Sequence, residues 1–215
     1  MALAKACIFD LDGVVVDTAK YHYLAWKRLA EELGFDFTKE DNELLKGVSR
    51  VRSFQIILEI GGKELSEEAF QEAMDKKNKW YLEYIYKMTP EEILPGVSDF
   101  LSLLKDNGIK IALGSASKNA KTILEQIKML DAFDAIVDGT HVSKPKPDPE
   151  VFLIGAKELG VEPTECVVFE DAIAGVEAAK NGNMHCIGVG DPEVLGKADF
   201  VISTFEGLGL DRIDF

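Results

Sequence analysis

The sequence contains only three cysteines among its 215 residues, Cys7, Cys166 and Cys186, and each lies in a short apolar run. An odd number without metal-ligand spacing argues against a disulfide framework or a zinc site, so we expect buried, reduced thiols. No apolar run reaches the roughly 18 residues of a membrane-spanning helix, and we expect no membrane span. The first ten residues lack the apolar stretch and cleavage site of a signal peptide. These absences together predict a cytoplasmic protein.

Basic residues are also scarce. Lysine and arginine number 24 against 38 aspartates and glutamates, which gives a formal net charge of −14. Nucleic-acid binding needs a basic surface, so this balance argues against it. The overall field would also repel a phosphorylated substrate, and a phosphate site would need local clusters of cations.

Six short apolar runs predict strands that are buried on both faces, as in a parallel sheet. They cover residues 5–11, 109–115, 135–138, 166–170, 185–189 and 200–203. Helix patterns separate these runs after about residue 91; Val97, Phe100, Leu101 and Leu104, for example, follow the i, i+3, i+4, i+7 rule. This alternation predicts an α/β fold with a Rossmann-like, doubly wound parallel sheet.

Residues 16–90 have a different pattern. Helix patterns cover residues 18–33 and 66–86, and no convincing strand interrupts them. The sequence therefore predicts two domains: a sheet domain formed by residues 1–15 and 91–215, and a helical domain, residues 16–90, inserted after the first strand.

Carboxylates gather where two predicted strands end. Asp10 and Asp12 follow the first strand, and Glu170 and Asp171 close the strand at residues 166–170. Ligands of open parallel sheets bind at the carboxyl ends of the strands, so these four side chains should converge. Their mutual repulsion favours a divalent cation with oxygen ligands, and Mg²⁺ suits carboxylates and phosphate oxygens. The alternative is a set of unrelated surface carboxylates.

The spacing of the first pair suggests a division of labour. Residues i and i+2 of an extended segment point to one side, and Gly13 then allows a sharp turn. Asp10 can attack phosphorus and form an aspartyl phosphate. Asp12 can carry the proton of the alcohol oxygen that leaves or attacks.

Two further segments suit a phosphate site. The polar loop at residues 115–119 follows a strand and precedes a helix, so its hydroxyl and N–H groups can hold phosphoryl oxygens. Lys144 lies in a proline-rich loop and can neutralise a phosphorylated aspartate. The alternatives are serines that cap a helix and a solvated loop lysine.

These motifs, in this order, resemble those of the haloacid dehalogenase superfamily over the whole chain. Asp10-Leu11-Asp12-Gly13-Val14 resembles its nucleophile motif, Ser115 its phosphate-binding residue, Lys144 its lysine and Glu170-Asp171 its acidic metal motif. The resemblance implies a helical cap inserted after the first motif, and Mg²⁺ as cofactor, bound by Asp10, Asp12, Glu170 and Asp171. The acid at Asp12 implies the phosphotransferase branch, because the dehalogenases themselves lack it.

The helical segment resembles the cap of sugar-phosphate mutases in that branch, with Leu45-Lys46-Gly47-Val48-Ser49-Arg50 similar to a loop that grips a distal phosphate. The resemblance implies these substrate-binding residues: Thr18, His22, Trp26, Lys46, Gly47, Val48, Ser49, Arg50, Ser53, Lys77, Ser115, Ala116, Ser117, Lys118 and Asn119. Arg52 departs from the pattern because relatives carry an acid there. Lys46, Arg50 and Arg52 also form a basic cluster that can hold phosphate, or simply a solvated face.

The implied reaction moves a phosphoryl group between the 1 and 6 positions of glucose. Asp10 would carry the group, and a β-glucose 1,6-bisphosphate would be the intermediate. A sugar-phosphate phosphatase would share the catalytic residues and is the main alternative; a non-catalytic binding protein is the other. We expect a sugar phosphate as the partner, no nucleic acid or membrane, and a monomer.

Overall fold

The computed structural model describes residues 3–45 and 48–215. The chain divides into two compact units, one formed by residues 1–17 and 89–215 and the other by residues 18–88. These boundaries lie two residues from the predicted ones at each crossing. We call the first the sheet unit and the second the helical unit.

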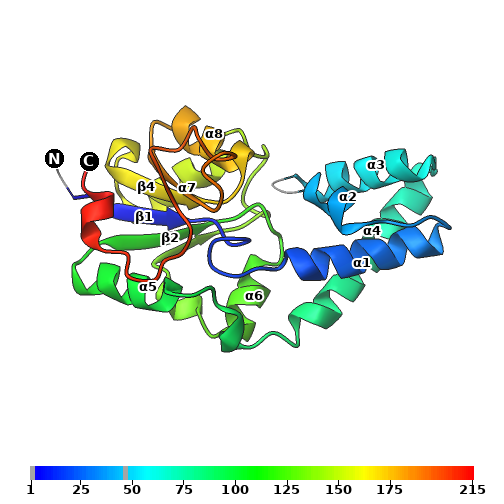
Figure 1. The fold of residues 1–215 in the computed structure, drawn as a ribbon, viewed down its shortest axis with the longest axis horizontal. Coiled ribbons are helices and arrows are strands. Elements are labelled where there is room, and N and C mark those ends of the chain that lie inside the picture. The colour runs from blue at the N-terminus through cyan, green and yellow to red at the C-terminus, as the bar shows by residue number, and fades with distance from the viewer. Residues whose placement is uncertain (1–2, 46–47) are drawn as a thin grey trace. The chain divides into compact units, whose positions relative to one another are not determined.

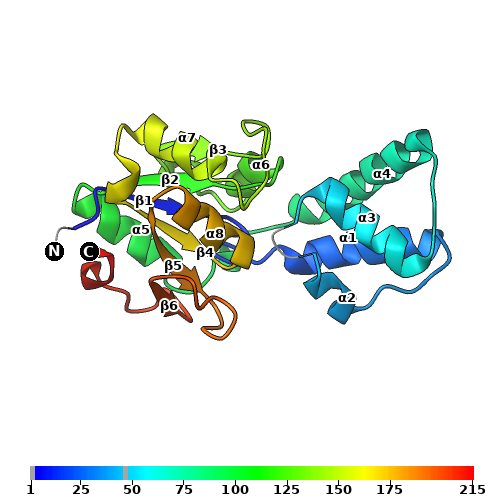
Figure 2. The ribbon, with the colours of Figure 1, turned by 90° about the horizontal axis from the view of Figure 1, so that it is seen from above.

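The sheet unit contains six parallel strands: β1 Ala6–Phe9, β2 Lys110–Gly114, β3 Ala135–Val137, β4 Cys166–Glu170, β5 His185–Val189 and β6 Phe200–Ile202. Their order is β3-β2-β1-β4-β5-β6, with every neighbouring pair parallel. Figure 2 shows the strands side by side, with β1 near the middle. Each of the six predicted strands is present, and the predicted α/β fold is confirmed.

The central strand β1 is apolar because both of its faces are covered, and all four of its residues are fully buried. Ile8 packs in a core with Phe152 of one face. Phe9 stacks on Phe169, with ring centroids 4.7 Å apart, and meets Phe100 edge to face on the other side. This burial fixes the end of β1, and with it the position of the next residue, Asp10.

Helices cover the two faces of the sheet (Figure 1). They are α5 Val97–Asp106, α6 Ala120–Gln126, α7 Glu150–Leu159 and α8 Ile173–Asn181, with four short 3₁₀ turns at Pro90–Glu92, Leu130–Ala132, Pro163–Glu165 and Leu210–Ile213. In Figure 1, α7 and α8 lie above the strands and α5 below them. The carboxyl ends of β1, β2 and β4 carry the segments that contain the candidate site.

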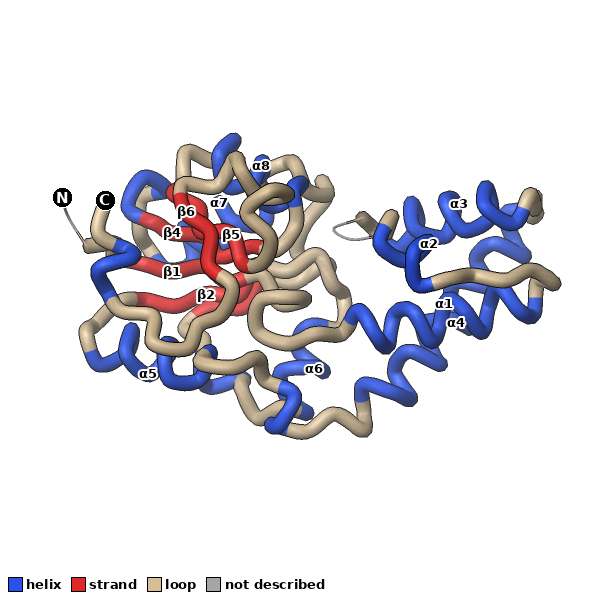
Figure 3. Tube along the Cα trace, in the orientation of Figure 1, coloured by secondary structure: helices blue, strands red, loops and turns tan. Residues whose placement is uncertain are grey.

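The helical unit consists of α1 Ala19–Glu32, α2 Lys39–Glu43, α3 Arg50–Gly61 and α4 Glu67–Ile85. In Figure 3, the described part of this unit contains helices and loops only. Its core includes Trp26 and Phe54, whose rings stack with centroids 5.7 Å apart. Ser49 and Ser66 cap α3 and α4 by accepting backbone N–H bonds, and Gly62 ends α3 in the left-handed conformation.

The three cysteines are free and buried, as the sequence predicts. Within the described ranges, no helix is both long and apolar enough to cross a membrane.

Candidate active site

Asp10 follows β1 directly and is 7% exposed. Its backbone N–H donates to the carbonyl of Phe169 at 2.9 Å, which continues the pairing of β1 with β4. After it, the N–H groups of Val15 and Val16 both donate to the carbonyl of Leu11. Buried valines hold this tight loop against the core, so the nucleophile candidate stands on a rigid support.

Gly13 allows the ends of β1 and β4 to approach each other. It has a φ of 76°, and a Cβ placed on it would lie 2.1 Å from Oδ2 of Asp171. No other residue type leaves room for the Asp171 carboxylate there. The glycine that the sequence assigns to a sharp turn therefore also makes space for an acid from the second pair.

Lys146 joins the two strand ends electrostatically. Its Nζ lies 2.6 Å from Oδ1 of Asp10 and 2.5 Å from Oε1 of Glu170, and its side chain is 5% exposed. The other Glu170 oxygen accepts the N–H of Ala172 at 2.7 Å. A buried ammonium group thus bridges the nucleophile candidate and an acid from β4.

The sequence analysis assigned this role to Lys144, and that assignment is wrong, because Lys146 is the lysine that contacts Asp10. The Lys144 side chain is 68% exposed and its Nζ pairs with Asp148 at 3.5 Å, outside the carboxylate cluster. Lys144 and Lys146 each precede a proline, with a second proline two residues later, so the sequence pattern fits both. The structure brings Lys146, and not Lys144, to the strand ends.

The carboxylate cluster perturbs its own protonation. Burial raises the pKa of Asp171, and the neighbouring Glu170, Asp10 and Asp12 raise it further, to about 8. Burial also raises the pKa of Glu170, against the opposing effect of Lys146. Burial alone would lower the pKa of Lys146, but Asp10 and Glu170 raise it above its usual value. The site thus gathers more negative charge than its one buried cation balances.

The polar loop after β2 is ordered by its own hydroxyls. Ser115 is buried, and its Oγ accepts the N–H of Ser117 at 3.1 Å; the Ser117 Oγ in turn accepts the N–H of Asn119 at 3.2 Å. Because β2 lies beside β1, Ser115 stands at the same edge of the sheet as Asp10. The roles of Ser115, Ala116, Ser117, Lys118 and Asn119 as phosphate ligands stay predictions.

In the helical unit, the predicted residues His22, Trp26 and Lys77 come together. The Nζ of Lys77 lies 2.8 Å from Nδ1 of His22 and 4.2 Å from the centroid of the Trp26 ring. Tyr81, which the sequence analysis missed, stacks on His22 with centroids 4.2 Å apart and lies under the same ammonium group. The sequence held one signal for Tyr81: it lies four residues after Lys77 on α4, so the two side chains share a face of the helix.

Arg50 is the first residue of α3, and its charge interacts with His22, Tyr81 and Asp75. Burial lowers its pKa, yet an arginine remains charged at neutral pH. Arg52 is directed elsewhere, because its Nη1 lies 2.9 Å from Oε1 of Glu59. The basic cluster predicted from the sequence therefore loses Arg52 to an ion pair along α3.

The remaining cap predictions are of three kinds. Thr18 and Ser53 are buried, and Ser49 caps α3; their assignment to substrate binding stays a prediction. The N–H of Val48 donates to the carbonyl of Leu45 at 3.2 Å. Lys46 and Gly47 lie outside the described residues.

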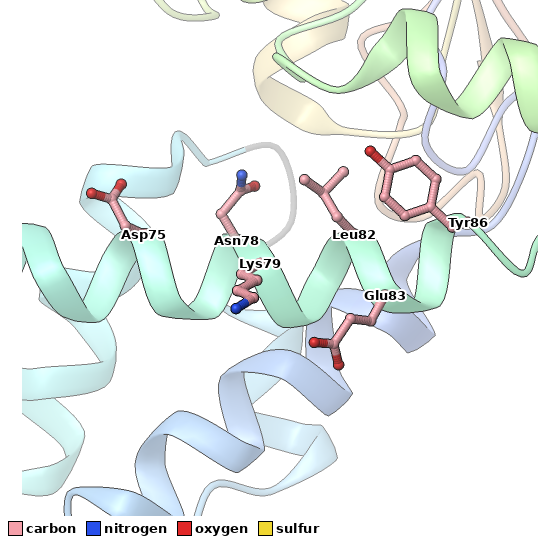
Figure 4. A pocket seen from close by; sticks show the side chains of 6 residues that line it. All are labelled: Asp75, Asn78, Lys79, Leu82, Glu83 and Tyr86. Atoms are coloured by element: carbon pink, nitrogen blue, oxygen red, sulfur yellow. The ribbon is translucent and has the colours of Figure 1, made fainter.

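A hollow runs along another face of α4. Asp75, Asn78, Lys79, Leu82, Glu83 and Tyr86 line it. Figure 4 shows Asp75, Asn78, Leu82 and Tyr86 projecting from one side of the helix. This face combines polar and apolar groups, and Lys77 is not among the residues that line it.

The haloacid dehalogenase-like hydrolase family model matches residues 4–183, which include every motif of the sheet unit described above. The chain belongs to this family. Membership confirms the predicted superfamily, and the roles of the strand-end carboxylates stay predictions.

Relatives of the chain include a mutase and several phosphatases. The chain is 46% identical to the β-phosphoglucomutase of Bacillus subtilis over 211 residues, which cover 97% of this chain and 93% of that protein. It is 34% identical to a phosphorylated carbohydrates phosphatase of Thermotoga maritima, over 85% of this chain and 83% of that protein. The crystal structure of a β-phosphoglucomutase from Clostridium difficile is similar at a TM-score of 0.93, with 44% identity, and covers 98% of this chain and 96% of that one.

Proposed function

We propose that this chain is a β-phosphoglucomutase that interconverts β-D-glucose 1-phosphate and D-glucose 6-phosphate. The observation that carries the proposal is 46% identity over 97% of the chain to a protein of that name, combined with the Asp10–Lys146–Glu170 arrangement at the sheet edge. The sugar-phosphate phosphatase is the second candidate, and it is supported by relatives at 34% identity.

In the proposed reaction, Asp10 carries the phosphoryl group as an aspartyl phosphate. Lys146 holds one carboxylate oxygen of Asp10, which orients the other for attack on phosphorus. Asp12 takes the proton from the attacking sugar hydroxyl and returns it in the reverse step. Ser115 and the N–H groups of its loop orient the phosphoryl oxygens. Transfer to the sugar gives β-glucose 1,6-bisphosphate, which must then present its other phosphate to Asp10.

The carboxylates fit a magnesium ion by their chemistry. Asp10, Asp12 and Asp171 offer hard oxygen donors. Burial raises the pKa of Asp171, and the neighbouring Glu170, Asp10 and Asp12 raise it further, to about 8. Glu170 lies beside them, although its oxygens accept bonds from Lys146 and Ala172. Within the part of the chain that the structure describes, no three acidic, cysteine or histidine side chains form a ready-made metal site. A bound Mg²⁺ would supply charge neutralisation between carboxylate and phosphate.

A mutase differs from a phosphatase in its need to hold two phosphates. Arg50, whose charge acts on His22, is a cationic group of the helical unit that suits the phosphate not under attack. Exclusion of water is the second requirement, since water would hydrolyse the aspartyl phosphate.

We also propose that the protein acts as a monomer in the cytoplasm.

The distinguishing experiment supplies β-glucose 1-phosphate, Mg²⁺ and a trace of β-glucose 1,6-bisphosphate. Glucose 6-phosphate and inorganic phosphate are then measured in the same reaction. The mutase produces glucose 6-phosphate with little free phosphate. Fast release of phosphate with little isomer would assign the chain to the phosphatases instead, and absence of both products would favour the binding protein.

A further inference from the structure

Glu150, the first residue of α7, closes the loop that carries Lys146. Its Oε2 accepts the backbone N–H groups of Ser143 and Lys144, both at 2.7 Å, and its Oε1 accepts the Ser143 hydroxyl at 3.0 Å. A single carboxylate therefore ties the beginning of the loop to the helix that follows it.

Few other groups can hold this loop. Pro145, Pro147 and Pro149 have no N–H to donate. The N–H of Asp148 donates to the carbonyl of Pro145 at 3.0 Å, and the side chain of Asn181 donates to the carbonyl of Pro147 at 3.0 Å. The backbone N–H groups of Ser143 and Lys144 both donate to Glu150, which makes its carboxylate the anchor of the backbone in that half of the loop.

The two lysines of the loop differ in how exposed their side chains are. Lys144 is mostly exposed, whereas two residues later Lys146 is 5% exposed and reaches Asp10 and Glu170. Lysine has a long, flexible side chain, and burying its ammonium group requires that the backbone deliver it to one place. The N–H groups of Lys144 and Ser143 hold the pKa of Glu150 below its usual range, so the anchor is ionised at neutral pH.

We propose that Glu150 is a positioning residue for phosphoryl transfer: it fixes the loop of residues 143–149 so that the Lys146 ammonium group stays between Asp10 and Glu170. The proposal rests on the proposed function only through the catalytic use of Lys146. Glu150 itself touches no reacting atom.

The first test measures the burial of Lys146 without any substrate. The protein is treated with a trace of acetic anhydride, and the acetylation of each lysine is measured by peptide mass spectrometry. In the wild type, Lys146 should react at least about tenfold more slowly than Lys144, because its amine is buried and ion-paired. Glu150→Ala should raise the acetylation of Lys146 several-fold, while Glu158→Ala, an exposed glutamate on the same helix, should not.

The second test measures turnover. Glu150→Ala should lower kcat for glucose 6-phosphate formation by about 10- to 100-fold with little change in KM, because misplacement affects the chemical step. Glu150→Gln should restore most of the rate, since an amide oxygen can still accept both N–H groups. A role limited to the charge at the start of α7 would leave Gln as impaired as Ala.

These outcomes separate the two proposals. If Glu150→Ala does not fold, Glu150→Asp replaces it, because the shorter side chain keeps the charge and loses reach. Unchanged acetylation of Lys146 in the variant, or a Gln variant as slow as Ala, would overturn the positioning role. A wild type that releases phosphate without forming glucose 6-phosphate would overturn the proposed function and leave the acetylation test intact.

Discussion

At the scale of single residues, the site depends on which of two neighbouring lysines reaches the nucleophile candidate. Lys146 is buried between Asp10 and Glu170, and Lys144 is exposed. Both carry the same charge and both precede a proline, so their difference lies in the backbone that delivers them. This makes the pair an internal control for the electrostatic argument.

Lys146→Ala should therefore lower kcat far more than Lys144→Ala. Loss of a preorganised charge at the reacting group costs about 10²- to 10³-fold in rate, whereas loss of an exposed lysine costs little. Steady-state assays of glucose 6-phosphate formation with both variants check this. Comparable losses in the two variants would show that the buried bridge is not used in catalysis.

Residue identity also marks the limit of prediction from sequence. Asp10, Asp12, Glu170 and Asp171 could be placed at one sheet edge because strand ends are readable from apolar runs. The choice between Lys144 and Lys146 could not be made, since it depends on hydrogen bonds to Glu150 from residues that the pattern does not link. Tyr81 was missed because a buried aromatic residue on a helix is usually core.

At the scale of elements, α1 and α4 bring a histidine and a lysine together. His22 and Lys77 lie 2.8 Å apart, enclosed by Trp26 and Tyr81. Burial, then Lys77, then Arg50 hold the pKa of His22 well below its ordinary 6.5. A neutral imidazole can accept the bond from the ammonium group, whereas a protonated one would repel it.

The helical unit should consequently lose stability in mild acid. The unfolded chain takes up a proton on His22 near pH 6.5 and the folded chain does not, so this contribution is present above that pH and falls below it. The loss is at most about 1.4 kcal/mol per pH unit. Both tryptophans, Trp26 and Trp80, lie in the helical unit, so their fluorescence reports on it alone.

Urea unfolding followed by tryptophan fluorescence, at about pH 5.5 and about pH 7.5, measures this difference. His22→Gln should show a smaller loss of stability in acid than the wild type. His185→Gln, in the sheet unit, should behave as the wild type does. An identical pH dependence in the wild type and in His22→Gln would contradict the assigned low pKa.

The elements themselves differed in how well the sequence predicted them. The strands were found because they are continuous, mostly apolar runs, and five of them are largely buried, whereas Phe200 of β6 is exposed. The long α1 and α4 were also visible as periodic patterns. The five-residue α2 was not identified separately, since it is too short to display a helical period and is held by its Thr38 cap.

At the scale of the whole molecule, we propose that the sheet unit carries out the chemistry and that the helical unit binds the second phosphate. Arg50 and Arg52 are two positions apart on α3, but Arg52 is paired with Glu59. Substitution of each arginine therefore gives a matched pair of variants that tests whether the helical unit binds the second phosphate.

Arg50→Ala should lower kcat/KM for isomerisation by about a hundredfold or more, because a phosphate loses a charge-assisted contact. Phosphorylation of Asp10 by acetyl phosphate should remain near the wild-type rate, since that small donor has no second phosphate. Arg52→Ala should leave both reactions almost unchanged. Equal loss of isomerisation and phosphorylation in Arg50→Ala would remove its assigned role.

The central claim concerns Asp10 as the carrier of a phosphoryl group that is passed to a sugar. The enzyme is first labelled with radioactive phosphate from acetyl phosphate and Mg²⁺, then mixed with unlabelled β-glucose 1-phosphate and quenched within milliseconds to seconds. The account predicts label on the Asp10 peptide that moves to glucose bisphosphate and then to glucose 6-phosphate, and no labelling of Asp10→Asn. Label on another residue, or label released as inorganic phosphate without appearing on the sugar, would contradict it.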